Sequence, residues 1–387
     1  MKKFLVINYP GHGHVNPTIK MMKDLICLRN EVVCYCTEEF RGIVEKTGAR
    51  FKSYNYEPLE EDDDKIDEHL PIENAIRLAD AMLSTILKEK ESFDVIIYDS
   101  VLSIGEDIAQ RLNIKKTVAL YTTFAISKNM VSLVKKSGKR TFLVNGDSDE
   151  FKGRTREINE KYDIKLRSMI DNVSDCKAQK KLVFASKYYQ PFIEDFDQSF
   201  LFLGPSIIER GEEIKFDFEK EEGKTLIYIS QGTKDTKKIE FYQTTFRAFG
   251  DLEKIEVILS VGKKTDIESL GKIPSNFKVY NYVPQLEVLK KADIFITHGG
   301  MNSCSEGLYH SIPLIVLPQF GDQILVSKIV KNSGAGIMIH RVDVTELTLR
   351  EAVGEIIANS SYKNNATLIG ESLRNASKEA NQIYKDL

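Results

Sequence analysis

Short apolar segments alternate with amphipathic segments along most of the chain, and the alternation starts a second time after residue 217. Strands that alternate with helices form parallel sheets whose two faces are covered by helices. The apolar segments predict strands at 4–8, 31–36, 93–98, 117–121, 182–185 and 200–203, and again at 225–230, 257–260, 277–280, 294–297 and 314–317. We therefore expect an α/β fold with two doubly wound, Rossmann-like sheets.

The boundary between the two halves is marked by composition. Residues 204–217 combine glycine, proline and charged residues without apolar periodicity, which predicts a linker. The first domain would then span 1–203 and the second 218–370, followed by a polar helix at 371–387. The acidic run at 60–64 is predicted to be a solvated loop, because a dense block of like charge seldom forms a metal site.

Composition excludes several classes of partner. The net charge of −3 provides no basic surface for a nucleic acid polymer. No apolar run is long enough to span a bilayer, and the run at 4–8 is too short for a secretory signal. The five cysteines lack metal or disulfide spacing, which is typical of reduced thiols. A cytoplasmic protein without stable membrane insertion is expected.

The stretch 297–306 is the most informative motif. Two glycines follow the predicted strand 294–297 and lead into a helix, for which Asn302 and Ser303 are suitable N-cap residues. Glu306 follows Ser303 at capping-box spacing. A helix N-terminus after a glycine turn binds anions, and His298 adds a donor, so a phosphate site is one interpretation. A plain strand-to-helix junction is the other.

A second polar group follows the next predicted strand. Pro318 ends the apolar segment 314–317, and Asp322 and Gln323 come shortly after it. Ligands of open α/β sheets bind beyond the carboxyl ends of the strands. Both loops should therefore border one crevice.

The turn after the first strand contains Gly11, His12, Gly13 and His14. Asn16 suits an N-cap and Pro17 a first helical position, which would place His14 at the carboxyl edge of the sheet, just before the helix. A dinucleotide-binding fingerprint is an alternative, but its third glycine is missing. His14 could also serve only to bind loop backbone.

Taken together, the polar positions resemble the donor-binding box of the UDP-dependent glycosyltransferases, the large inverting GT-B family, and the bacterial macrolide glycosyltransferases most of all. The matching positions are Pro284, Gln285, His298, Gly300, Asn302, Ser303, Glu306, Pro313, Pro318, Asp322 and Gln323. The family pattern opens with a tryptophan, and Tyr282 stands there instead. The choice between UDP and dTDP as nucleotide therefore stays open.

The resemblance implies a GT-B architecture, in which two Rossmann-like domains face a cleft. The N-terminal domain would bind the acceptor and the C-terminal domain the nucleotide sugar, and the last helix would pack back onto the first domain. The implied reaction moves a hexose, with glucose favoured, from a UDP-sugar to a hydroxyl group. The acceptor would be a small hydrophobic molecule such as a macrolide, a flavonoid or another phenolic natural product.

Two residues receive catalytic roles from the resemblance. His14 matches the family's general base, in a Gly-His-x-x-Pro turn that ends at Pro17. Asp99 ends the segment 93–98 at the same predicted sheet edge and matches the acid that orients the base.

The remaining roles concern the donor, and no metal or further cofactor is implied. The diphosphate would be bound by Gly232, Thr233, His298, Gly300, Asn302 and Ser303. The nucleoside would be bound by Tyr282, Val283, Gln285 and Glu306, and the sugar by Asp322 and Gln323.

Two other functions stay open at this stage. A sugar-nucleotide epimerase on the same fold would need neither His14 nor Asp99. A natural-product binding protein without catalytic activity could have lost either residue, yet the sequence has both.

Overall fold

The chain divides into two compact units. In the computed structural model, the first unit contains residues 1–206 and 376–387, and the second contains 207–375. The structure describes the chain apart from residues 60–68, 132–145, 208–217, 233–237 and 320. Most of the predicted linker at 204–217, the acidic run at 60–64 and the predicted site residue Thr233 lie outside the described residues.

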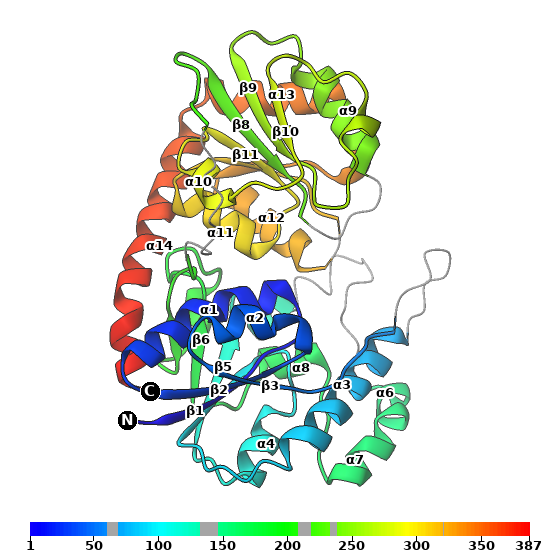
Figure 1. The fold of residues 1–387 in the computed structure, drawn as a ribbon, viewed down its shortest axis with the longest axis vertical. Coiled ribbons are helices and arrows are strands. Elements are labelled where there is room, and N and C mark those ends of the chain that lie inside the picture. Colours follow the sequence, from blue (N-terminus) through cyan, green and yellow to red (C-terminus); the bar gives the residue numbers. More distant parts are fainter. Residues whose placement is uncertain (60–68, 132–145, 208–217, 233–237, 320) are drawn as a thin grey trace. The chain divides into compact units, whose positions relative to one another are not determined.

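The first unit is built on a seven-stranded sheet in the order β3-β2-β1-β4-β5-β6-β7 (Figure 1). Every neighbouring pair is parallel. The strands are β1 (Lys3–Ile7), β2 (Glu31–Cys36), β3 (Arg50–Ser53), β4 (Val95–Asp99), β5 (Lys116–Tyr121), β6 (Lys180–Val183) and β7 (Phe200–Phe202). The strand order reverses between β1 and β4, so the loops that follow these two strands diverge and leave room for a ligand.

Successive side chains of a strand point to opposite faces of the sheet, and Phe4, Leu5, Val6 and Ile7 are all completely buried. Both faces of this sheet are therefore covered, and helices cover them. The helices are α1 (His12–Cys27), α2 (Arg41–Glu45), α3 (Leu70–Ile86), α4 (Gly105–Arg111), α6 (Asp149–Arg154), α7 (Arg156–Tyr162) and α8 (Met169–Ser174). Short 3₁₀ turns lie at Glu38–Phe40 and Ile193–Asp195.

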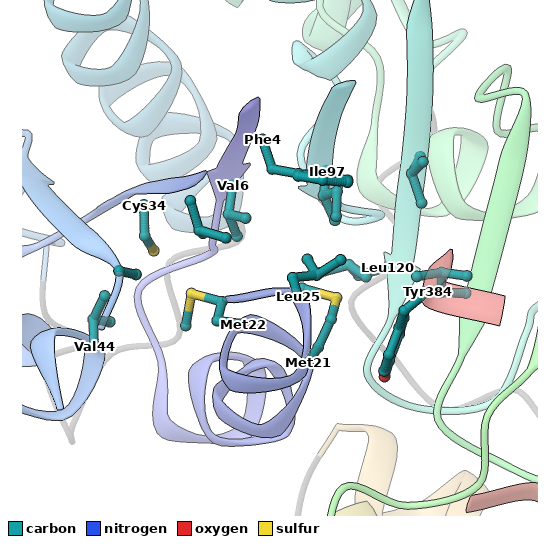
Figure 2. Close-up of a cluster of buried hydrophobic side chains, with 14 of the residues drawn as sticks. Phe4, Val6, Met21, Met22, Leu25, Cys34, Val44, Ile97, Leu120 and Tyr384 are labelled. Atoms are coloured by element: carbon teal, nitrogen blue, oxygen red, sulfur yellow. The ribbon is translucent and has the colours of Figure 1, made fainter. Parts of the chain in front are cut away.

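One apolar core fixes α1 on the sheet. Met21, Met22 and Leu25 of α1 point toward strand residues such as Val6, as Figure 2 shows. Tyr384, near the end of the chain, belongs to the same core, which explains why residues 376–387 group with the first unit. Burial of side chains of this size stabilises the fold by about 1.5–3 kcal/mol each.

The second unit repeats the plan with six parallel strands, in the order β10-β9-β8-β11-β12-β13. The strands are β8 (Thr225–Ser230), β9 (Ile255–Ser260), β10 (Phe277–Tyr280), β11 (Ile294–Thr297), β12 (Leu314–Val316) and β13 (Gly336–Met338). The helices are α9 (Lys238–Phe249), α10 (Gln285–Leu289), α11 (Met301–Tyr309), α12 (Asp322–Asn332) and α13 (Glu346–Ala358), with 3₁₀ turns at Glu268–Leu270 and Arg341–Asp343. The last helix, α14 (Ser361–Lys385), begins in this unit, and its residues from 376 on belong to the first unit. Here the order reverses between β8 and β11.

The predicted fold class, two parallel Rossmann-like sheets, is confirmed. Two edge strands were not predicted from the sequence. β3 is Arg-Phe-Lys-Ser, which is mostly polar, and β13 has only three residues. In the described part of the chain, no helix combines the length and the apolar character needed to cross a membrane.

The predicted start of α1 was wrong, and the difference concerns the site. The helix begins at His12, with Gly11 as its N-cap and without a side-chain cap. The amides of His14 and Val15 both donate to the Gly11 carbonyl, each at 2.9 Å, so the backbone is already helical ahead of Asn16. His14 therefore lies in the first helical turn and not ahead of it.

The predicted cap of α11 was also wrong, because this helix too begins at a glycine ahead of the predicted cap residues. Gly300 is the N-cap, and Asn302 and Ser303 lie in the first turn. The Cys304 amide donates to the Gly300 carbonyl at 3.0 Å and closes this turn. Both residues thereby present their backbone amides at the positive end of the helix.

Candidate functional site

The predicted site residues gather at the carboxyl edges of the two sheets, and each edge is described by itself. In the first unit the edge is formed by the residues after β1, β4 and β5, which are neighbours in the sheet. In the second unit it is formed by the residues after β8, β11 and β12, again neighbours, and by those after β10.

In the first unit, His14 and Asp99 are in direct contact. His14 Nδ1 lies 2.7 Å from Asp99 Oδ2. Asp99 is the last residue of β4 and its side chain is completely buried, while 29% of the His14 side chain is exposed. The second carboxylate oxygen accepts the Val101 amide at 3.1 Å. Because an ionised carboxylate only accepts, Nδ1 carries hydrogen and the lone pair of the neutral ring is on Nε2.

Two further side chains surround the imidazole, and neither was predicted. Thr122 Oγ1 lies 3.2 Å from His14 Nδ1, and the ring centroid of Tyr9 lies 4.8 Å from that of His14. Burial raises the pKa of the Tyr9 hydroxyl, and the negative charge of Asp99 raises it further, so the phenol stays neutral. Thr122 directly follows β5, so its position at the sheet edge was the available signal.

The neighbouring histidine has different surroundings. His12 is exposed, and its ring packs edge-on against Phe40 at 5.1 Å between centroids. The structure thus separates the two histidines of the turn, because only His14 has the carboxylate partner that a general base requires.

In the second unit, His298 lies between two glycines. A Cβ atom on Gly232 would come within 2.9 Å of His298 Cε1, and a Cβ atom on Gly300 within 2.5 Å of Nε2. The Thr297 hydroxyl lies 3.4 Å from His298 Nδ1. The absence of two side chains therefore makes room for the imidazole beside the start of α11.

The starts of α11 and α12 lie close together. Gly299 has a positive φ of 83°, and a side chain there would collide with the Ser327 hydroxyl of α12. Asp322 opens α12, and its negative charge adds to the effect of burial in raising the pKa of the Cys304 thiol of α11. Gln323 is buried, and its Oε1 accepts the Gln319 amide at 3.0 Å. Polar side chains and helix amides therefore share this edge.

Two of the predicted nucleoside-binding residues, Gln285 and Glu306, are joined by a hydrogen bond, and Tyr228, which was not predicted, extends the chain. Gln285 Nε2 donates to Glu306 Oε2 at 2.6 Å, and the Tyr228 hydroxyl donates to Gln285 Oε1 at 3.2 Å. Glu306 is buried, and Tyr228 stacks on Phe295 with 4.8 Å between centroids. The side-chain amide of Gln285 thus holds the Glu306 carboxylate, whose oxygens act as hydrogen-bond acceptors.

Tyr282 and Val283 differ in exposure. Tyr282 is 36% exposed, and the Lys263 ammonium lies 5.3 Å from the centroid of its ring. Val283 is buried. Among the described residues, no three His, Cys, Asp or Glu side chains gather in an arrangement that could hold a metal ion.

Comparisons with known proteins agree with this geometry. Residues 263–374, which include the His298 and Asp322 loops, match the family model "UDP-glucoronosyl and UDP-glucosyl transferase". The chain is 33% identical over 385 residues to an uncharacterized UDP-glucosyltransferase, YojK, of Bacillus subtilis (strain 168), across 97% of this chain and 94% of that protein.

Two more distant proteins are also similar. Oleandomycin glycosyltransferase of Streptomyces antibioticus is 24% identical over 351 residues, across 88% of this chain and 80% of that protein. The crystal structure of the calicheamicin glycosyltransferase CalG4 matches with a TM-score of 0.83 at 22% identity, across 100% of this chain and 98% of that chain. At this identity, the structural likeness establishes the fold.

Proposed function

Because the chain belongs to the UDP-glucoronosyl and UDP-glucosyl transferase family, we propose that it moves a hexose, with glucose favoured, from a UDP-sugar to a hydroxyl of a small hydrophobic acceptor. Membership confirms the predicted class of enzyme, a UDP-glycosyltransferase with the GT-B fold. No observation favours the epimerase or the binding protein. We further propose that the enzyme acts in the cytoplasm, in accord with five cysteines that all remain unpaired.

The acceptor class rests on the relatives. Two of the similar proteins are named for oleandomycin and calicheamicin, which are natural products. We propose a macrolide, a flavonoid or another phenolic compound as acceptor for this chain. Tyr9, beside the imidazole of His14, adds an apolar ring surface that suits such a molecule.

The contact between His14 and Asp99 is the observation that carries the mechanism. An acceptor hydroxyl is a poor nucleophile until its proton is removed. His14 Nε2 would accept this proton while the oxygen bonds to the anomeric carbon of the sugar. The bond between that carbon and the diphosphate breaks at the same time, from the opposite side, so the configuration inverts. Asp99 would stabilise the imidazolium through Nδ1, and the proton later passes to solvent.

The leaving diphosphate gains negative charge, and the second unit offers groups to bind it. The first-turn amides of α11 around Asn302 and Ser303 and the ring of His298 would stabilise this charge, next to the loop at Gly232. Since protein dipoles supply this stabilisation, we propose that no metal ion is required.

The other donor contacts follow from the described chemistry. Glu306 would accept hydrogen bonds from the ribose, with Gln285 beside it. Tyr282 would stack on the base, and Asp322 and Gln323 at the start of α12 would bind hydroxyl groups of the sugar. An equatorial hexose such as glucose suits this pair of side chains.

The test is a transfer assay with UDP-glucose and a panel of macrolide, flavonoid and simple phenolic acceptors, read by mass spectrometry. We expect products heavier by one hexose, and NMR of the product should show the anomeric configuration opposite to that of the donor. Calorimetry with UDP and dTDP then identifies the nucleotide. Retention of configuration, or hexose release without an acceptor product, would refute the mechanism.

A further inference from the structure

The imidazole of His14 has a second polar neighbour besides Asp99. Thr122 is buried, and its Oγ1 lies 3.2 Å from the same Nδ1 atom that faces Asp99 at 2.7 Å. A single N–H can be shared between two acceptors. Once Nε2 takes a proton, the ring becomes cationic, and each hydrogen bond from Nδ1 to an acceptor becomes stronger than it was for the neutral ring.

A buried side chain, that of Gln190, binds the loop that carries Thr122. Gln190, which is 4% exposed, accepts the Ala125 amide through Oε1 at 2.9 Å and donates through Nε2 to the Ala125 carbonyl at 3.0 Å. The same amide nitrogen donates to the Pro191 carbonyl at 2.9 Å. One side chain thus satisfies both backbone groups of a residue three positions after Thr122.

Aromatic packing strengthens the connection between the two loops. The rings of Phe124 and Tyr189 pack edge to face, with 5.1 Å between centroids. The loop after β5, which carries Thr122, is therefore fastened to the loop after β6 by two adjacent residues, Tyr189 and Gln190. Such a fastening limits the movement of the Thr122 hydroxyl, because a buried, fully bonded amide is costly to displace.

We propose that Thr122 is a positioning residue that shares the Nδ1 hydrogen of His14 with Asp99, and that Gln190 keeps it in place. The inference rests on the proposed role of His14 as general base. Thr122 would fix the plane of the ring, so that Nε2 keeps its direction, and would stabilise the imidazolium that forms during transfer.

Titratable side chains that contact the ring enter any pH dependence. Asp99 faces it from β4, and Tyr9 from the loop after β1. Tyr9 stays neutral at acidic pH, because its hydroxyl pKa is raised. On its own helix, His12 contacts Phe40. The acid limb of a pH–rate profile therefore reports on His14 with its acceptors.

The chain offers a matched control one residue away. The Thr123 hydroxyl is also buried, but among the described residues it has no hydrogen-bond partner. Thr122→Val and Thr123→Val each replace a threonine hydroxyl group with a methyl group, and Thr122→Ser keeps the hydroxyl group. We expect Thr122→Val to lower kcat roughly three- to tenfold, because the rate depends on how much this hydrogen bond strengthens when the ring becomes cationic, with Thr122→Ser and Thr123→Val close to wild type.

The pH profile distinguishes positioning from packing. Without the second acceptor the imidazolium is less stable, so the midpoint of the acid limb should move to lower pH in Thr122→Val only. A loss of rate with an unchanged midpoint, or an equal loss in Thr122→Ser, would overturn the proposal. An active His14→Ala would instead refute the proposed base, whereas an inactive His14→Ala beside a normal Thr122→Val would refute only the inference.

The role of Gln190 is tested by a double-mutant cycle. Gln190→Met keeps the length of the side chain and removes both bonds to Ala125. If Gln190 acts through Thr122, it should lower kcat by a similar factor, and the double variant should be no slower than Thr122→Val. Additive losses would show that Gln190 acts independently. Unchanged UDP affinity, measured by titration, confirms that each variant remains folded in its donor-binding unit.

Discussion

Gly232 and His298 are in direct contact, and the contact leaves no room for a side chain. A Cβ atom on Gly232 would lie 2.9 Å from Cε1 of the imidazole and 3.2 Å from each ring nitrogen. Gly300 approaches the same ring from the start of α11, where a Cβ atom would lie 2.5 Å from Nε2. The loop after β8 and the first turn of α11 therefore fix one histidine between two stretches of bare backbone.

This contact predicts that Gly232→Ala weakens donor binding. The added methyl group must displace His298, and we expect UDP affinity to fall about tenfold or more, since a charge-assisted hydrogen bond contributes about 1.5–3 kcal/mol. Gly232 also has a positive φ of 71°, so strain must be separated from collision. Gly223 has a φ of 77° with open space around it, and Gly223→Ala is the control. Equal losses of UDP affinity in both variants would contradict the role of the contact.

Catalysis should not depend on a divalent ion. Helix amides and His298 would stabilise the leaving diphosphate, so turnover after dialysis against EDTA should stay within about twofold of the untreated enzyme, as expected for electrostatic stabilisation by protein groups. Added magnesium or manganese should not raise it further. A strict requirement for either ion would show that the diphosphate is bound in another way.

Tyr282 should contribute to nucleotide binding through its ring. Stacking of a base on an aromatic side chain contributes about 1–3 kcal/mol, so Tyr282→Ala should weaken UDP binding roughly five- to hundredfold, whereas Tyr282→Phe should be close to wild type. Calorimetry with UDP and with dTDP measures both variants. If Tyr282→Ala binds UDP normally, the ring serves another purpose, such as its contact with Lys263.

The sequence was sufficient to predict the central strands and the edge of the sheet where the site lies. A parallel strand covered on both faces must be apolar throughout, as Val95 to Tyr98 are, so it is recognised without any neighbour. The order of such strands then places His14 and Asp99 at one edge. Edge strands such as β3 are not recognised in this way, because they can carry polar side chains that are exposed to solvent.

The helix starts and the neighbours of His14 could not be predicted, for a different reason. Asn16 and Pro17 have the chemistry of a helix start, but the backbone of Gly11 begins the helix earlier without a side-chain cap. The contact between Thr122 and His14 depends on the conformation of a loop that Gln190 fixes from 65 positions further along the chain. Neither effect leaves a periodic pattern in the residues.

Glu89 should make the stability of the first unit depend on pH. Burial would raise its pKa, but hydrogen bonds from Lys52 and Tyr35 outweigh burial and lower the pKa to about 2. The Tyr35 hydroxyl donates at 2.7 Å, and the amides of Lys90 and Glu91 donate at 2.9 and 3.1 Å. The folded pKa lies below the unfolded value of about 4.3, so this stabilisation is complete above that pH and is lost as the pH falls toward 2.

Glu89→Gln should therefore lower the free energy of unfolding by about 2–3 kcal/mol at pH 7, and the difference should shrink at pH 3. Chemical denaturation at both values measures it. Glu287→Gln is the control, because Glu287 pairs with Lys290 on the surface, where both side chains are 45% exposed, and such pairs contribute little. An effect of Glu89→Gln that is the same at pH 3 and pH 7 would show that shape, not charge, is responsible.

The last prediction separates the two histidines of the first turn. His14→Ala should lower kcat by roughly 10²–10⁴, the contribution of a general base, and should leave UDP affinity unchanged, since the proposed nucleotide site lies on the second unit. Asp99→Asn should cost less, because it disturbs the tautomer of the imidazole without removing it. His12→Ala should be mild, because its ring is exposed and packs on Phe40. Single-turnover transfer and UDP titration measure all three variants, and full activity of His14→Ala, or a loss confined to His12→Ala, would reject the assignment of the base.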